Sequence, residues 1–140
     1  MSNTIEAIEQ AIVARLLARP GLSQFQVEAW PSDAAQYVLR SQLGAVLVGY
    51  KGSHYGPPVP TDGVAQDRQM EFEVTAMVRG LRDHSGGYPV LEEVRLALTG
   101  WMAPGALRPA FFTKDGFVGE EQGVWEFAAY ITVPHLNVQD

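Results

Sequence analysis

The most regular pattern in the chain is an alternation of apolar and polar residues between Gln69 and Arg79. A side-chain period of two predicts a β-strand with one buried face and one solvent-facing face. The apolar positions are Met70, Phe72, Val74, Ala76 and Val78, and the residues between them include Glu71 and Glu73. This strand would extend roughly 36 Å, about twice the usual length. We therefore expect Phe72, Val74 and Ala76 to hold the core, and Gln66–Glu71 and Arg79–Arg82 to leave the parent sheet.

The remaining elements are predicted from the spacing of apolar residues and from the prolines and glycines that end helices and strands. Apolar residues at helical spacing predict one helix from Asn3, which can cap it, to Arg19, and a second from Tyr88 with Pro89 in its first turn. A short helix is predicted within 32–43. Further strands are predicted at 24–30, 45–50, 110–118 and 124–133. Residues 51–65 contain three prolines and three glycines, which predicts a long loop or ordered arm without regular structure.

The order of these elements predicts an α+β fold. Its sheet is expected to be mostly antiparallel, with the two main helices packed on one face. The length of 140 residues suits a single domain over 1–140, and no repeat or low-complexity tract divides it.

Composition and charge exclude several classes of protein. The chain is 46% hydrophobic and 19% charged, as expected for a globular protein, and its apolar runs are too short to cross a membrane. The polar N-terminus resembles neither a signal nor a transit peptide. The absence of cysteine excludes disulfides and thiolate metal sites and agrees with a reducing cytoplasm. A formal charge of −6 argues against bulk attraction to a nucleic-acid backbone.

No motif supports chemistry. Three histidines occupy separate loop-like contexts, and "DHS" at 83–85 is better explained by a turn than by a triad. "GYKGS" at 49–53 lacks the spacing of a phosphate loop. The pairs Glu92–Glu93 and Glu120–Glu121 suit a solvated helix face and a turn. We expect no catalytic residue, no cofactor, no metal and no enzymatic activity.

Aromatic and charged residues indicate instead a surface that forms a protein–protein interface. Arg68, Arg79 and Arg82 surround the long strand, and Glu71 lies between them; such charges can pair across identical subunits. The alternative is a solvated strand face on which arginine stems cover aromatic rings. The candidate subunit or tube interface comprises Lys51, His54, Tyr55, Arg68, Glu71, Arg79, Arg82 and Trp101.

Residues 45–133 resemble the small tail protein of Mu-like phages and prophages. The resemblance rests on Gln66-Asp67-Arg68 within "QDRQMEFEVTAMVRGLR", on "GGYPVLEEVRLALTGWMAPG", and on "EEQGVWEFAAYITV". Such proteins are similar in type to tail terminators, which are α+β proteins that cap the tail tube as a hexameric ring and stop its polymerisation.

The resemblance implies a structural tail terminator or completion protein that connects the tail to the head. Its partners would be copies of itself in a homohexamer, the tail tube, the sheath protein and the head–tail connector. It would assemble in the host cytoplasm, reside in the virion tail, and bind neither membrane nor specific nucleic-acid sequences, since DNA only passes through its negatively charged lumen. The alternative is a small binding module that uses the 51–65 loop, with a partly apolar pocket beside it.

Overall fold

The structure, a computed structural model, describes residues 3–31, 39, 41–60 and 63–138. Most of the short helix predicted within 32–43 lies outside these residues. Two helices, two 3-10 turns and six strands are assigned in the described residues: α1 (Thr4–Leu17), η1 (Pro20–Leu22), β1 (Gln26–Ala29), β2 (Gly44–Tyr55), β3 (Val59–Pro60), β4 (Val64–Arg79), η3 (His84–Gly87), α2 (Tyr88–Leu98), β5 (Phe111–Glu121) and β6 (Val124–Val138).

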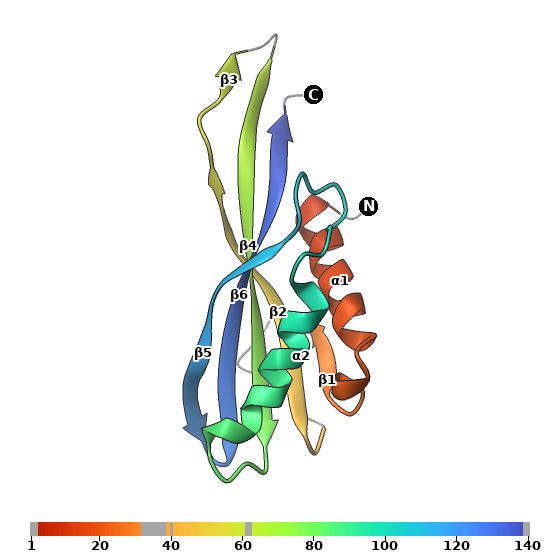
Figure 1. Cartoon of the computed structure of the whole chain (residues 1–140), viewed down its shortest axis with the longest axis vertical. Helices are drawn as coiled ribbons and strands as arrows, with labels where there is room; N and C mark the ends of the chain where they lie inside the picture. Colours follow the sequence, from red (N-terminus) through yellow and green to blue (C-terminus); the bar gives the residue numbers. More distant parts are fainter. Residues whose placement is uncertain (1–2, 32–38, 40, 61–62, 139–140) are drawn as a thin grey trace.

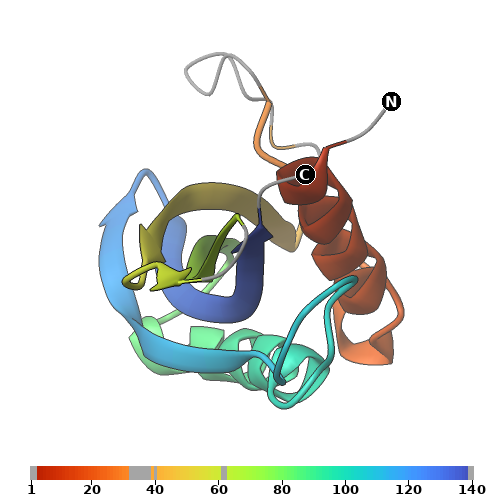
Figure 2. The same cartoon turned by 90° about the horizontal axis from the view of Figure 1, so that it is seen from above.

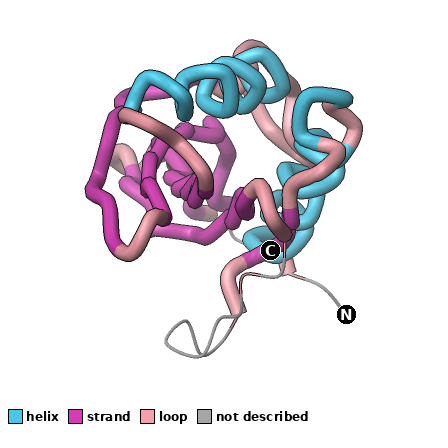
Figure 3. The backbone as a smooth tube through the Cα atoms, turned by 90° about the horizontal axis from the view of Figure 1, so that it is seen from below, coloured by secondary structure: helices cyan, strands magenta, loops and turns pink. Residues whose placement is uncertain are grey.

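The strands form one sheet in the order β1-β2-β4-β6-β5, and β3 also pairs with β4. Only β1 and β2 run parallel; the other pairs are antiparallel. Both helices lie on one side of the sheet, which is strongly twisted and curled (Figures 1, 2 and 3). The predicted α+β fold with helices on one face is therefore confirmed.

The helices begin where the sequence places their caps. The Asn3 side chain accepts a hydrogen bond from the backbone N–H of Glu6 at 2.7 Å, and Pro89 lies in the first turn of α2. Each helix turns a stripe of apolar residues to the sheet: Ile8, Ile12 and Leu16 from α1, and Val90, Val94, Ala97 and Leu98 from α2.

The core forms between these stripes and alternate residues of the central strands. In β4, Met70, Phe72, Val74, Ala76 and Val78 are all buried, as the period of two predicts. Their partners in β6 on the same face include Phe127, Ala129 and Ile131. The predicted core residues of the long strand are confirmed.

The long strand is longer than predicted and does not leave its sheet. β4 contains 16 residues, and Gln66–Glu71 pair with β6 on one side, while Arg68–Glu71 also pair with β2 on the other. The expectation that Gln66–Glu71 separate from the sheet is wrong, because β2 and β6 are extended as well: β6 continues to Val138. The backbone groups that an overlong strand would expose are paired within the chain.

For the described residues of 51–65, the prediction that this stretch lacks regular structure is also wrong; residues 61 and 62 lie outside the described residues. β2 continues to Tyr55, β3 follows at Val59–Pro60, and β4 already begins at Val64. Gly52, with φ +146°, lies at a bulge that follows Tyr50 and lets β2 continue past it. Pro60 lies in an outer strand, where a missing N–H can face away from the sheet.

Candidate assembly surface

The extended ends of the central strands form an arm that projects beyond both helices (Figure 1). We define the arm as residues 51–60 of β2, β3 and their connection, 64–69 of β4, and 134–138 of β6. In Figure 1 neither helix covers it. A ribbon built from the ends of β2, β4 and β6, with β3 beside β4, has little core of its own where no helix covers it, so its stability depends on the sheet below it and on whatever covers it.

The arm begins where the covered face of β4 changes from apolar to polar. Met70 and Phe72 are fully buried, whereas Arg68 and Gln66, which are the next two residues on the same face, are only partly buried. The strand continues while the core ends, so the length of β4 serves the arm and not the core.

Polar side chains connect β2, β4 and β6 within the arm. The Arg68 Nε donates to the Ser53 hydroxyl at 3.2 Å, and its guanidinium carbon lies 5.8 Å from the centre of the Tyr55 ring. The Gln66 amide nitrogen donates to the carbonyl of Gly56 at 2.8 Å, and Asn137 donates to the Gln66 side-chain oxygen at 2.8 Å. These contacts hold the arm as an ordered extension of the sheet.

Apolar side chains on the arm remain accessible. Tyr55 is 52% exposed and Val59 is 55% exposed, and Val64 and Val138 are similarly accessible. Apolar groups gathered on a projecting element are typical of a surface that contacts another protein. Val59, Val64 and Val138 are not among the predicted interface residues, although for Val59 and Val64 an apolar side chain within a polar, proline-rich stretch was the available signal.

On the sheet face opposite the helices, Glu73 joins three strands. Its carboxylate accepts from the Thr75 hydroxyl at 2.8 Å and lies 3.8 Å from the Lys51 ammonium. A hydrogen bond from Tyr130 to the same carboxylate raises the pKa of the Tyr130 phenol, and the negative charge of Glu73 and of the nearby Glu71 acts in the same direction.

This arrangement predicts that Tyr130 ionises at a higher pH than an ordinary tyrosine. In Glu73→Gln the acceptor charge is lost, so the pKa of Tyr130 should fall toward its usual value. A raised pKa in the folded state stabilises the fold below the unfolded value near 10 and loses that effect as pH rises through the folded value. Spectrophotometric titration, with Tyr130→Phe assigning the signal, measures the shift; identical curves for wild type and Glu73→Gln would contradict it.

The structure brings some predicted interface residues together and separates others. Lys51, His54, Tyr55 and Arg68 lie in the arm, and Glu71 lies at its base. Arg79 ends β4 at the opposite end of the strand, and Arg82 follows it, also exposed. Trp101 is half-buried against the core, with the Arg15 guanidinium carbon 5.6 Å from the centre of its ring. That these eight residues contact a partner remains a prediction.

The candidate chemical motifs occupy structural positions. Asp83 caps the turn η3, because its carboxylate accepts from the Ser85 backbone N–H at 3.0 Å. Glu93 forms an ion pair with Arg19 at 2.7 Å, and Glu92 pairs with Arg95. The Glu120 carboxylate accepts from the Gly123 N–H at 2.7 Å in the turn between β5 and β6. Within the described residues, no group of three or more His, Asp or Glu side chains could hold a metal ion.

Two cavities lie away from the arm. One, of about 640 Å³, is bordered by the β5–β6 turn and the end of β4, including Met77, Arg79 and Glu126. The other, of about 410 Å³, lies beside the start of α2 and includes Phe25, Leu43 and Pro89. Neither is lined by the described residues of 51–65, where a binding module would place its pocket. No described helix has the length and apolar character needed to cross a membrane.

The chain is similar to one protein family and to a solved structure. No curated protein sequence matches the chain. Among solved structures, a chain from "Virion of native gene transfer agent (GTA) particle" shares the fold, with a TM-score of 0.66 over 97% of this chain and 100% of that chain, at 12% sequence identity. The family model described as "Gp37 protein" matches residues 12–140. Because this match extends over nearly the whole sequence, the chain belongs to the Gp37 family.

Proposed function

We propose that the protein is a non-enzymatic structural component of a phage-like particle, and more specifically a tail terminator or completion protein of the Mu-like type. Copies would form a ring, in our proposal a hexamer, that caps the tail tube and connects it to the head. The ring would assemble in the host cytoplasm and remain in the virion tail. Membership of the Gp37 family and a fold shared with a chain of a gene transfer agent virion support a structural role.

The observation that carries the proposal is the arm. It projects beyond the helices, is held in shape by its own polar contacts, and presents accessible apolar residues and the cations Lys51 and Arg68. A subunit that must contact neighbours or a tube needs such an element, whereas an isolated domain gains nothing from exposing it. The formal charge of −6 suits a lumen through which DNA passes without being held.

Imaging tests the proposal directly. Purified protein should form rings by negative-stain electron microscopy, and when mixed with its tail tube it should occupy one end of the tube and stop further growth. Tubes assembled without it should exceed the normal length. A protein that remains monomeric at high concentration, both alone and with tubes, would contradict the assignment.

Charge reversal at Arg68 tests the role of the arm. Arg68→Glu is expected to weaken assembly, because a cation in the arm is replaced by an anion, while the monomer keeps its fold: the bond to Ser53 is partly exposed, and such contacts contribute only about 1 kcal/mol. Light scattering measures the assembly, and circular dichroism checks the fold. Arg108→Glu, the same charge change at an exposed position outside the arm, is the matched control. An oligomer equally stable in both variants would exclude Arg68 from the interface.

A further inference from the structure

The outer edge of β5 and the outer edge of β2 in the arm both have backbone groups that pair with no second strand among the described residues. β5 is the last strand of the sheet, and within the described residues it pairs only with β6. At the other end, β1 pairs with β2 only from Ala45 to Val48, so the part of β2 from Lys51 to Tyr55 has β4 as its only strand neighbour among the described residues. Free edges of this kind readily pair with another strand.

The hydrogen-bond alternation identifies which residues point outward on β5. The two-residue turn Gln122–Gly123 makes Glu121 and Val124 a hydrogen-bonded pair, and bonded and non-bonded pairs then alternate along the strands. When the alternation is followed through the register shifts, the backbone groups of Phe112, Asp115 and Glu120 face away from β6.

The same reasoning applies to the edge of β2. The Trp30 N–H donates to the Val48 carbonyl, so Val48 faces the β1 side, and the Gly56 N–H donates to the Asp67 carbonyl, so Gly56 faces β4. Because neighbouring residues alternate, the backbone groups of Tyr55 and Ser53 face outward. Each copy therefore carries a free edge in β5 and a free edge at Lys51–Tyr55 of the arm; β6 beyond Thr132 and the outer side of β1 also pair with no second strand among the described residues.

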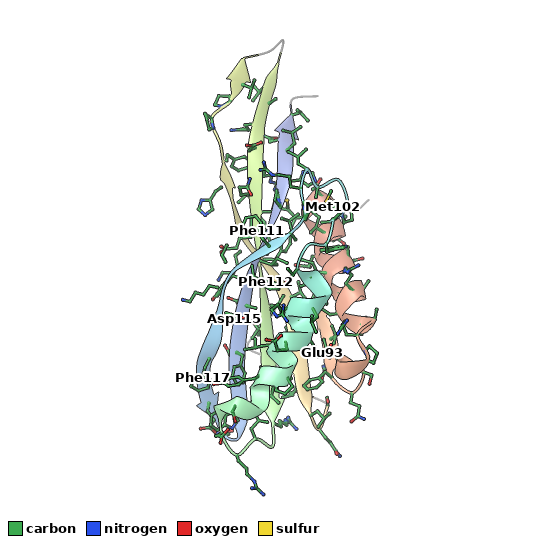
Figure 4. All side chains as sticks on the ribbon, in the orientation of Figure 1. Glu93, Met102, Phe111, Phe112, Asp115 and Phe117 are labelled. Atoms are coloured by element: carbon green, nitrogen blue, oxygen red, sulfur yellow. The ribbon has the colours of Figure 1, made fainter. Side chains whose placement is uncertain are left out.

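The side chains of the two edges are complementary. β5 is exposed along most of its length and carries accessible apolar side chains, with Phe111 46% and Val118 58% exposed. Figure 4 shows Phe111, Phe112, Asp115 and Phe117 following one another along this strand. From Phe111 to Glu121 there is one lysine against one aspartate and two glutamates, whereas the edge from Lys51 to Tyr55 contains one lysine and no acidic residue. The Lys51 ammonium lies 3.8 Å from the Glu73 carboxylate of its own sheet, so the arm edge carries no excess negative charge, and a less acidic edge beside exposed Tyr55 suits the acidic, apolar edge of β5.

Irregularities on both edges limit what can pair with them. β5 has register shifts between Phe112 and Lys114 and between Phe117 and Gly119, and β2 has one after Tyr50. Bulged edges resist indiscriminate pairing with flat strands. A partner with a correspondingly twisted edge is favoured, and the chain itself supplies one.

We propose that the outer edge of β5 in one copy pairs with the arm edge Lys51–Tyr55 of a second copy, so that the sheet continues from copy to copy. This inference rests on the proposed function and specifies its subunit contact. Each copy uses two different surfaces, so the contact can close into a ring. It also places the exposed apolar side chains of β5 beside exposed Tyr55 of the arm.

Proline substitution at an outward-facing residue of β5 tests the pairing. Asp115→Pro removes an outward N–H without removing a bond to β6, and prolines are tolerated on edge strands. We expect the concentration needed for assembly to rise roughly tenfold or more, the effect of losing one hydrogen bond and its strand geometry. Asp115→Ala is the matched control: it removes the carboxylate but keeps the N–H, and should assemble more readily than Asp115→Pro. Thermal unfolding of both variants verifies the fold.

Cross-linking provides an independent test on the unaltered protein. The only lysines of the chain are Lys51, at the arm edge, and Lys114, in β5. In a mixture of ¹⁴N- and ¹⁵N-labelled protein, an amine-reactive cross-linker should join Lys51 of one isotope to Lys114 of the other. If these links occur only within one isotope, the proposed pairing is overturned.

The outcomes separate this inference from the proposed function. Rings that form equally well with Asp115→Pro would overturn the β5 contact and leave the terminator assignment intact. The same holds if Asp115→Pro still forms rings but no longer binds the tail tube, because β5 would then contact the tube and not a second copy. Loss of assembly in Asp115→Pro, with mixed-isotope Lys51–Lys114 links in the wild type, supports the pairing.

Discussion

Phe72→Ala is expected to lower the free energy of unfolding by about 3–5 kcal/mol, the cost of truncating a fully buried aromatic residue. Phe72 is 0% exposed, lies in the central strand, and has its ring 5.4 Å from that of Tyr50. The cavity would open beneath both helices, where the rigid strands cannot collapse into it.

Urea unfolding measures this loss. The control is Phe111→Ala, because Phe111 is 46% exposed on an outer strand and its truncation should cost much less. Equal losses for the two variants would mean that the face of β4 under the helices is not the centre of the core. Because Phe72 lies just below the arm, a severely destabilised Phe72→Ala should also assemble poorly, through lost folded protein.

Gly44→Ala is expected to cost several kcal/mol, for two reasons that can be separated. Gly44 begins β2 with φ +144°, which a residue with a Cβ adopts only under strain, of order 1–3 kcal/mol. An added Cβ would also overlap the backbone carbonyl oxygen of Met77 in β4, and overlap in a packed site costs a further 1–3 kcal/mol or so. Relief would require the two central strands to move apart.

Gly52→Ala is the matched control. Gly52 has nearly the same φ, +146°, but an added Cβ would meet nothing within 4 Å. This variant should therefore suffer only the backbone strain. Chemical denaturation of the pair measures the difference, which is the contribution of the contact with Met77. A smaller loss for Gly44→Ala than for Gly52→Ala would refute the close packing of β2 on β4.

The core could be predicted because burial imposes a period on the sequence. Phe72 and Val74 alternate with polar neighbours, and the stripe of α2 recurs at helical spacing, so fold class and core followed from pattern alone. The arm could not be predicted in this way. From Met70 to Arg68 the face of β4 beneath the helices changes from apolar to polar. Beyond this point neither face of the strand is buried, and a strand with two accessible faces resembles a loop in sequence.

The candidate interface was harder still to predict. Lys51, His54, Tyr55 and Arg68 lie together in the arm because of the register between β2 and β4, which pairs Tyr55 with Arg68. That register depends on a bulge beside Gly52 that no alternation reveals. Trp101 is packed against the core beside Arg15, a contact between distant parts of the chain that the sequence pattern does not reveal.

β4 is shared between the arm and the core, and this has a mechanical consequence. The same strand carries Arg68 in the arm and Phe72 beneath the helices, and it is paired with β6 along its length. The arm is therefore a rigid extension of the sheet, and its base is held by the core. Its direction is fixed before any partner is met, so little chain entropy is lost on contact. A load applied at the arm by a neighbouring protein would pass along continuous ladders of hydrogen bonds directly into the core.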